Sequence, residues 1–242
     1  MPTPVSFDPA IARQFVRYAH LVAGRGYIHN TLGNMVMRVP HPDHAHGVAY
    51  TKPSQISLEE MGESDLVITD VPSPAILHGT RMTSVGHNLS REILRLRPDI
   101  NATIHVHDDA TLALYSSGAP LEFRVLSLDP PFVLGKPVHF VPAHLDVEAD
   151  VSSVASFIRD TNLVVLVGHG LTAMGRNISE AYHRLNTFTA EVRRVLEAEK
   201  LSALKGTTPA YRAQAEIEDM YRFAERIIYP TRADHVMQDA AE

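Results

Sequence analysis

Two histidines separated by one residue are the part of this sequence best suited to chemistry. His105 and His107 lie in the run Asn101-Ala102-Thr103-Ile104-His105-Val106-His107, where apolar residues alternate with the histidines. Side chains two positions apart on a strand point to the same side of a sheet. Such a pair offers two neutral imidazoles to one divalent cation without any special loop. We therefore predict metal-assisted chemistry.

A third histidine follows a second apolar run. Residues 163–167 read Leu-Val-Val-Leu-Val and lead directly into Gly168-His169-Gly170, so His169 is the candidate for the third metal ligand. Another His-x-His, His44-Ala45-His46, lies in a stretch rich in Pro and Asp. With 14 histidines in 242 residues, about one such pair is expected by chance. We predict that the His44 pair is a solvated surface loop.

Composition narrows the kind of partner. The net charge is -6 without long blocks of like charge, which argues against nucleic-acid and membrane partners because both need a basic face. A small-molecule substrate is the expected partner. The chain has no cysteine, so any metal must rest on His, Asp or Glu. The N-terminal residues lack a signal-peptide pattern and no run is long enough to span a bilayer, so we expect a cytoplasmic enzyme.

The hydrophobic pattern predicts the elements that position these residues. Helices are predicted over 8–23, 89–96, 110–116, 147–159 and 179–200, and a docking helix over about 207–228. Strands are predicted over 33–39, 48–50, 66–69, around His105 and over 163–167. A pair of edge strands is predicted over 133–141. The polar residues 41–47 are predicted to form a hairpin or loop. No repeat or linker divides the chain, so we predict a single α/β domain over 1–242, with its core over about 8–200.

Four segments, taken in order, resemble the class II aldolase and adducin family. They are Gly33-Asn34-x-x-x-Arg38, Tyr50-Thr51-Lys52-Pro53-Ser54, the run from Arg97-Pro98-Asp99 to His107, and Val165-Leu166-Val167-Gly168-His169-Gly170 with Gly175 and Ala181. The resemblance extends over roughly Ile11 to Glu197. The family includes fuculose-phosphate and rhamnulose-phosphate aldolases and ribulose-phosphate epimerases.

The resemblance implies a fold and a cofactor. The fold is a central mixed, mainly antiparallel sheet covered by helices on both faces. One divalent ion, commonly zinc, with manganese or iron(II) as alternatives, is held by histidines that match His105, His107 and His169. In the family this ion binds vicinal substrate oxygens and stabilises an enediolate. Family members are often tetramers, so a homotetramer is expected, and tyrosines near the C-terminus reach a neighbouring site; Tyr211, Tyr221 and Tyr229 are the candidates.

The chain departs from the family where the catalytic glutamate is expected. That position falls on Gly86, which cannot transfer a proton. The neighbouring His87 can, since imidazole titrates near neutrality, and we predict it as the proton carrier. The alternative for His87 is a surface or capping residue. A shifted alignment would use Glu92, which lies well inside the predicted helix.

The phosphate-binding residues of the family are only partly kept. We predict that four residues with hydrogen-bonding side chains orient the substrate: Asn34, Thr51, Ser54 and Ser84. Gln55 replaces a loop glycine, and Val85 and Val36 replace serines, so donors and close backbone approach to an anion are lost. Lys52 and Arg81 could bind a carboxylate instead, or be solvated surface charges.

These changes favour a metal-dependent lyase that cleaves a carbon–carbon bond, by decarboxylation or retro-aldol reaction, in a small oxygenated acid or sugar derivative. Its ion would stabilise an enolate or enediolate. Three alternatives stay open: a non-heme iron(II) oxygenase on the same three histidines, a sugar-phosphate aldolase or epimerase whose base has moved, and a non-enzymatic interaction module such as adducin.

Overall fold

The computed structural model describes residues 5–145, 147 and 150–228. The described strands are β1 (Asn34–His41), β2 (His44–Thr51), β3 (Val67–Asp70), β4 (Ile76–His78), β5 (Ala102–Val106), β6 (His139–Val141), β7 (Leu163–Leu166) and β8 (Gly170–Gly175). The helices are α1 (Pro9–Gly24), α2 (His87–Leu96), α3 (Asp109–Ser116), α4 (Asp129–Leu134), α5 (Ala155–Ile158), α6 (Ile178–Lys205) and α7 (Gln214–Ile228), with short 3-10 turns η1 (Glu63–Asp65) and η2 (Val151–Val154).

All eight described strands form one sheet in the order β4-β3-β2-β1-β5-β8-β7-β6. Every neighbouring pair is antiparallel except β6 and β7, which are parallel. The predicted mixed, mainly antiparallel sheet is therefore confirmed.

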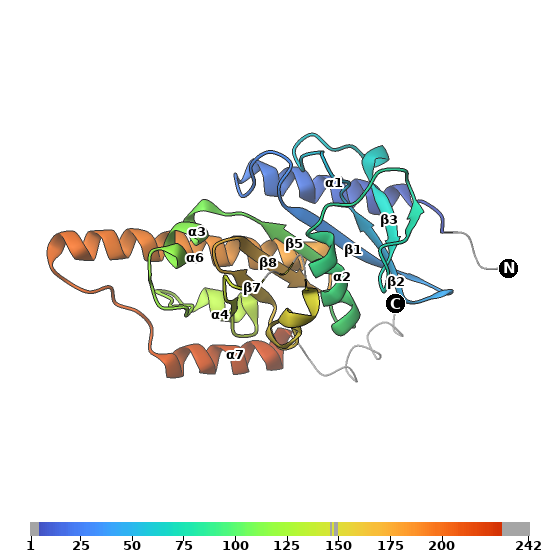
Figure 1. Ribbon diagram of the computed structural model, residues 1–242. Helices are drawn as coiled ribbons and strands as arrows, with labels where there is room; N and C mark the ends of the chain where they lie inside the picture. Colours follow the sequence, from blue (N-terminus) through green and yellow to red (C-terminus); the bar gives the residue numbers. More distant parts are fainter. Residues whose placement is uncertain (1–4, 146, 148–149, 229–242) are drawn as a thin grey trace.

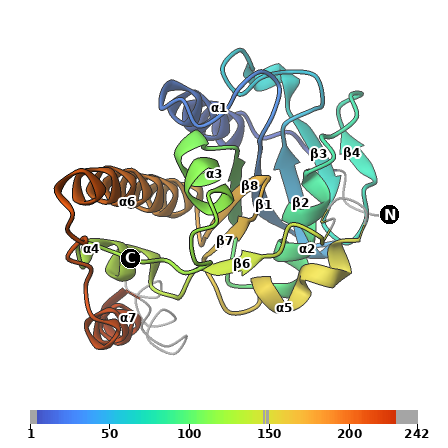
Figure 2. The same cartoon turned by 60° about the vertical axis from the view of Figure 1, so that its left-hand side comes forward.

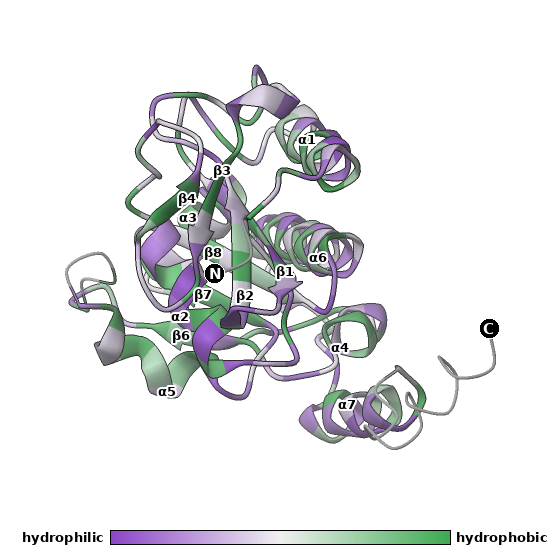
Figure 3. Cartoon of the chain, turned by 90° about the vertical axis from the view of Figure 1, so that its right-hand side faces the viewer, coloured by the Kyte–Doolittle hydropathy of each residue, from purple (hydrophilic) through white to green (hydrophobic). Residues whose placement is uncertain are grey.

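Helices cover both faces of this sheet (Figure 1, Figure 2). One core joins α1, α3 and α6 to the first face through residues such as Phe15, Phe188 and Ile104. The other joins α2 and α5 to the opposite face through Ile93, Ile158 and Val36. Figure 3 shows the strands as the hydrophobic centre of this three-layer α/β fold. The predicted fold class is thus confirmed.

Strand alternation decides which face the site occupies. Thr103 pairs with Val36 on one side and Met174 on the other. Val36 and Met174 both belong to the core under α2 and α5. His105, two residues beyond Thr103, therefore presents its side chain to this same face.

Arg38 fixes the end of α2 against β1. Its guanidinium donates to the carbonyl oxygens of Leu94 at 2.7 Å and of Arg97 at 2.9 Å, and also contacts the carbonyl oxygen of Ile100. The carbonyls of Leu94 and Arg97 are at the C-terminal end of the helix and have no partner within it, whereas Ile100 lies between the helix and β5. The arginine of the Gly-Asn-x-x-x-Arg segment thus anchors the helix that follows Gly86.

Two predicted elements differ from the structure, and a third is confirmed. The predicted pair of edge strands over 133–141 was wrong in its first half: α4 occupies 129–134 and ends at Gly135, whose φ of 69° is left-handed, so only β6 remains. The predicted helix over 147–159 is reduced to η2 and α5, and 148–149 lie outside the described residues. The predicted hairpin or loop at 41–47 is confirmed as a tight hairpin, in which His44 begins β2 and pairs with Asp70 at 2.9 Å.

Candidate metal centre

The predicted site residues gather at one end of the sheet. β1 begins at Asn34, β2 ends at Thr51 and β5 ends at Val106, and these three ends are adjacent in the strand register. The turn between β7 and β8 lies at the same end, because Leu171 pairs with Val106. Segments that are far apart in the sequence are thereby joined at one edge.

Three histidines converge there. Potential ligand atoms of His105, His107 and His169 all lie within 4.8 Å of one another. The Nε2 atoms of His105 and His107 are 3.0 Å apart. The ring of His169 lies 5.2 Å from that of His105 and 4.8 Å from that of His107, centroid to centroid. The structure therefore brings together the three residues predicted as ligands.

Each ring is positioned by its backbone. His105 is a residue of β5, and His107 follows the end of that strand and donates its backbone N–H to the carbonyl of Tyr27 at 3.2 Å. His169 lies in the turn after β7, where Gly168 has a φ of 78°. At Gly170 a Cβ would overlap the carbonyl oxygen of Val106, so the glycine lets this turn pack against the end of β5.

Burial keeps the imidazoles of His105 and His107 neutral. The pKa of His105 is lowered well below its ordinary value, first by burial and then by the two other histidines. The pKa of His107 falls to about 4, again first by burial and then by the neighbouring His169 and His29. At neutral pH both rings are therefore uncharged, with ring nitrogens available to a cation.

The donor set fits a divalent metal. Neutral imidazoles suit zinc and several transition metals, and two Nε2 atoms 3.0 Å apart are close enough to bind one ion. The other nitrogen of His105, Nδ1, lies 3.0 Å from the Thr172 hydroxyl, which fixes the ring orientation. The sequence interpretation missed Thr172, although it lies directly opposite His105 in the register of β5 and β8.

Asn34 stands beside His105 and fills the space next to Gly86. It is opposite His105 in the register of β1 and β5, and its side chain is buried. Its Oδ1 accepts a hydrogen bond from the Ser90 hydroxyl at 3.1 Å. A Cβ at Gly86 would lie 2.5 Å from Asn34 Nδ2. The position that resembles the family's glutamate is thus occupied by a glycine against which an amide packs.

His87 points into the protein. It is the first residue of α2 and only 1% exposed, and its Nε2 lies 2.9 Å from the Thr69 hydroxyl. Burial, reinforced by Arg91, lowers its pKa to about 3. Its Nδ1 has no hydrogen-bond partner among the described residues. Its role as proton carrier stays a prediction.

The three predicted hydroxyl residues differ in their surroundings. Thr51 is buried and donates to the carbonyl of Met35 at 3.3 Å. Ser54 is half-buried, and its backbone N–H donates to the carbonyl of Met82 at 2.7 Å. The Ser84 hydroxyl is buried and without a partner in the described part of the chain.

The alternative residues have other partners. Lys52 is fully buried, and its ammonium donates to the carbonyls of Ile56 at 2.7 Å and Thr31 at 2.9 Å. Arg81 pairs with Asp65 at 3.5 Å. Glu92 pairs with Arg95 within α2. Lys52 is therefore neither a surface charge nor an exposed carboxylate-binding group.

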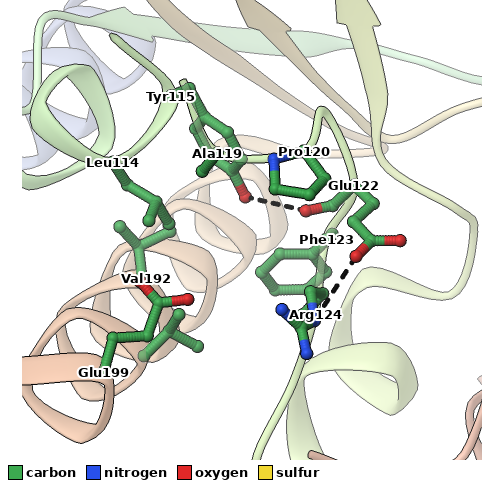
Figure 4. A pocket seen from close by; sticks show the side chains of 10 residues that line it. Leu114, Tyr115, Ala119, Pro120, Glu122, Phe123, Arg124, Val192 and Glu199 are labelled. Atoms are coloured by element: carbon green, nitrogen blue, oxygen red, sulfur yellow. Dashed lines mark hydrogen bonds and ion pairs between the residues drawn. The ribbon is translucent and has the colours of Figure 1, made fainter. Parts of the chain in front are cut away.

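A cavity lies beside one of the three histidines. A cavity of about 320 Å³ is lined by His169 together with residues 141–145 and Leu166. Figure 4 shows a different pocket of about 20 Å³ between α3, α6 and residues 119–124, in which Arg124 pairs with Glu122. Tyr211, a candidate tail tyrosine, lies under Arg124 and donates to Glu199 at 2.6 Å, while Tyr229 is outside the described residues.

A mixed sheet with three convergent imidazoles at one end defines an α/β protein with a candidate metal centre. The family described as Class II Aldolase and Adducin N-terminal domain matches residues 13–193. The chain belongs to the class II aldolase and adducin family, and the predicted resemblance is confirmed.

Known relatives of the chain differ in their reactions. It is 23% identical over 180 residues to an L-fuculose phosphate aldolase of Methanococcus vannielii, covering 70% of this chain and 87% of the relative. It is 25% identical over 185 residues to the decarboxylase NovR of Streptomyces niveus, covering 74% and 68%. An aldolase II superfamily structure from Pseudomonas syringae shares the fold with a TM-score of 0.77 at 18% identity, over 98% of this chain and 92% of the other.

Proposed function

We propose that this protein is a divalent-metal-dependent lyase. It would cleave a carbon–carbon bond, by decarboxylation or retro-aldol reaction, in a small oxygenated acid or sugar derivative. The observation that carries this proposal is the convergence of His105, His107 and His169, whose ligand atoms lie within 4.8 Å of one another. Membership of the family supports lyase chemistry, because the relatives of this chain include an aldolase and a decarboxylase.

The three histidines would hold the ion. When bound, a divalent ion such as zinc would act as a Lewis acid for the electron pair left by the broken bond. Thr172 would keep the His105 ring in place through its 3.0 Å contact with Nδ1. The same ligands would also accept manganese or iron(II).

Groups next to the triad would orient the substrate. Asn34 Nδ2 faces Gly86 beside His105, and the unpaired hydroxyl of Ser84 lies on the adjoining turn. Ser54 is held near that turn by its bond to Met82. Thr51, with its hydroxyl on the Met35 carbonyl, would act by fixing the end of β2.

His87 is our proposed proton carrier, and its contacts support a role for one of its two ring nitrogens. Nε2 is engaged by Thr69, so Nδ1, which is buried and has no partner among the described residues, is the nitrogen that would transfer the proton. Because its pKa is about 3, the ring would accept a proton only transiently at neutral pH.

Turnover with a substrate panel tests the proposal. Protein loaded with zinc, manganese or iron(II) is offered hydroxy acids and sugar phosphates under air and under nitrogen, and released carbon dioxide or aldehyde is measured. We expect metal-dependent release that is equal in both atmospheres. Turnover that survives removal of the metal, or that requires both iron and oxygen, would contradict a lyase.

The expected assembly is a homotetramer. Apolar side chains are exposed on α6 and α7, where Leu204 is 84% and Ile227 61% exposed. Light scattering of the purified protein measures the mass directly.

No helix in the described part of the chain is long and apolar enough to cross a membrane.

A further inference from the structure

The loops around Asn34 expose apolar side chains. Leu32 is 45% exposed, Met82 75% and Val85 59%, and these are three of the ten large hydrophobic residues that are exposed in the described part of the chain. Leu32 precedes Gly33 and Asn34, and Val85 precedes Gly86. Exposed apolar side chains thus lie next in sequence to the segments that hold Asn34 and Gly86.

Hydrogen bonds fix these loops relative to one another. The backbone N–H of Ser54 donates to the carbonyl of Met82 at 2.7 Å, and Pro53 pairs with Thr83 in a β-bridge. Lys52 donates to the carbonyl of Thr31 at 2.9 Å. The exposed apolar side chains therefore lie on fixed backbone.

These loops do not form a cradle for a phosphate. Gln55 has a left-handed φ of 62°, a conformation that favours glycine, and it carries an exposed side chain that a glycine would not have. Val85 brings two methyl groups and no donor.

The cationic side chains Lys52 and Arg81 of these loops already have other partners. The Lys52 ammonium is fully buried on carbonyl oxygens, and Arg81 pairs with Asp65. A phosphate dianion desolvated without a cation or several N–H donors is strongly disfavoured.

The cavity on the other flank of the triad has a mixed lining. Its wall includes Val141, Leu145 and Leu166 together with His144 and His169, and none of its lining residues is Lys or Arg. This cavity therefore offers no lysine or arginine to a phosphate.

We infer that the substrate carries an apolar, unphosphorylated group on the side of the molecule away from its metal-binding oxygens. The inference rests on the proposed function, since the oxygens are those that would meet an ion on the three histidines. It narrows the substrate class to small oxygenated acids with a hydrocarbon remainder. Val85 is the residue that we place against this remainder.

Three hydroxamates test the inference, because they chelate a metal in the same way and differ only at the far end. Acetohydroxamate, benzohydroxamate and phosphoglycolohydroxamate are titrated into the zinc-loaded protein by calorimetry. We expect benzohydroxamate to bind at least about tenfold more tightly than acetohydroxamate, by burial of the ring, and the phosphate probe to bind no more tightly than acetohydroxamate. Tighter binding of the phosphate probe, or equal binding of the two others, would overturn the inference.

A matched pair of variants locates the contact. Val85→Arg is expected to strengthen binding of the phosphate probe and to weaken binding of benzohydroxamate, each by about tenfold or more. Leu121→Arg adds the same charge between α3 and α4, at a residue that is 48% exposed, and should change neither. Equal effects of the two variants would refute a contact at Val85. If zinc binds but no hydroxamate does, the proposed function fails together with the inference. A preference for the phosphate probe would instead overturn the inference alone.

Discussion

Gly86 is required by its neighbour, not by its own backbone. Its φ of −62° and ψ of −6° are open to any residue, yet a Cβ would lie 2.5 Å from the buried amide of Asn34. A side chain at this position would push Asn34 off its bond with Ser90. The absence of a glutamate at position 86 and the fixed position of Asn34 therefore depend on each other.

Gly86→Ala should lower the free energy of unfolding by about 1–3 kcal/mol, as overpacking does, measured by urea denaturation. Gly24→Ala is the matched control, since nothing lies within 4 Å of a Cβ there, and it should change stability by less than about 1 kcal/mol. An unchanged stability in Gly86→Ala would show that Asn34 moves freely. Gly86→Glu should not create efficient aldolase activity, because it would displace Asn34.

His87 gives the protein a pH-dependent stability. Its folded pKa of about 3 lies below the ordinary 6.5, so between these values the unfolded chain binds a proton that the folded chain does not. Its contribution is complete above about pH 6.5 and falls by about 1.4 kcal/mol per pH unit as the solution becomes more acidic. In His87→Gln the slope of unfolding free energy against pH between 6 and 4 should decrease by that amount. An identical slope in the variant and the wild type would mean that His87 titrates normally.

At the scale of the element, α2 depends on an arginine outside it. Arg38→Met removes the donors to the carbonyls of Leu94 and Arg97 and should lower the unfolding free energy by about 1.5–3 kcal/mol. Arg95→Met, which breaks only an exposed pair with Glu92, should cost less than about 1 kcal/mol. Similar losses in the two variants would argue against the anchoring role.

Elements with a strong hydrophobic period could be predicted from the sequence, whereas elements set by local turn chemistry were missed. The alternation around His105 placed two imidazoles on one face, as observed. α4 was taken for a strand, although Pro130 and Pro131 at its start and Gly135 at its end are typical of a helix. The burial of Lys52 could not be predicted, because the carbonyls that hold it come from Thr31 and Ile56, on separate loops.

At the scale of the whole molecule, the sheet order creates the site. Residues 34, 105 and 169 belong to different parts of the chain and meet only because β1, β5, β8 and β7 are neighbours. Local patterns showed the three histidines, and the resemblance to a family supplied the order that joins them. Neither the local patterns nor the family resemblance could predict the contact between Asn34 and Gly86, because this contact depends on the distance between a strand and the start of a helix.

Zinc titration of the metal-free protein, followed by calorimetry near pH 7.5, tests the central claim most directly. We predict one ion per chain in the wild type and in His46→Ala, which alters the exposed second His-x-His. In His107→Ala the affinity should fall by more than about 100-fold, since even changes beyond the direct ligands cost about 10–100-fold. A wild type that binds no zinc, or a His107→Ala variant that binds it equally well, would contradict a metal centre at His105, His107 and His169.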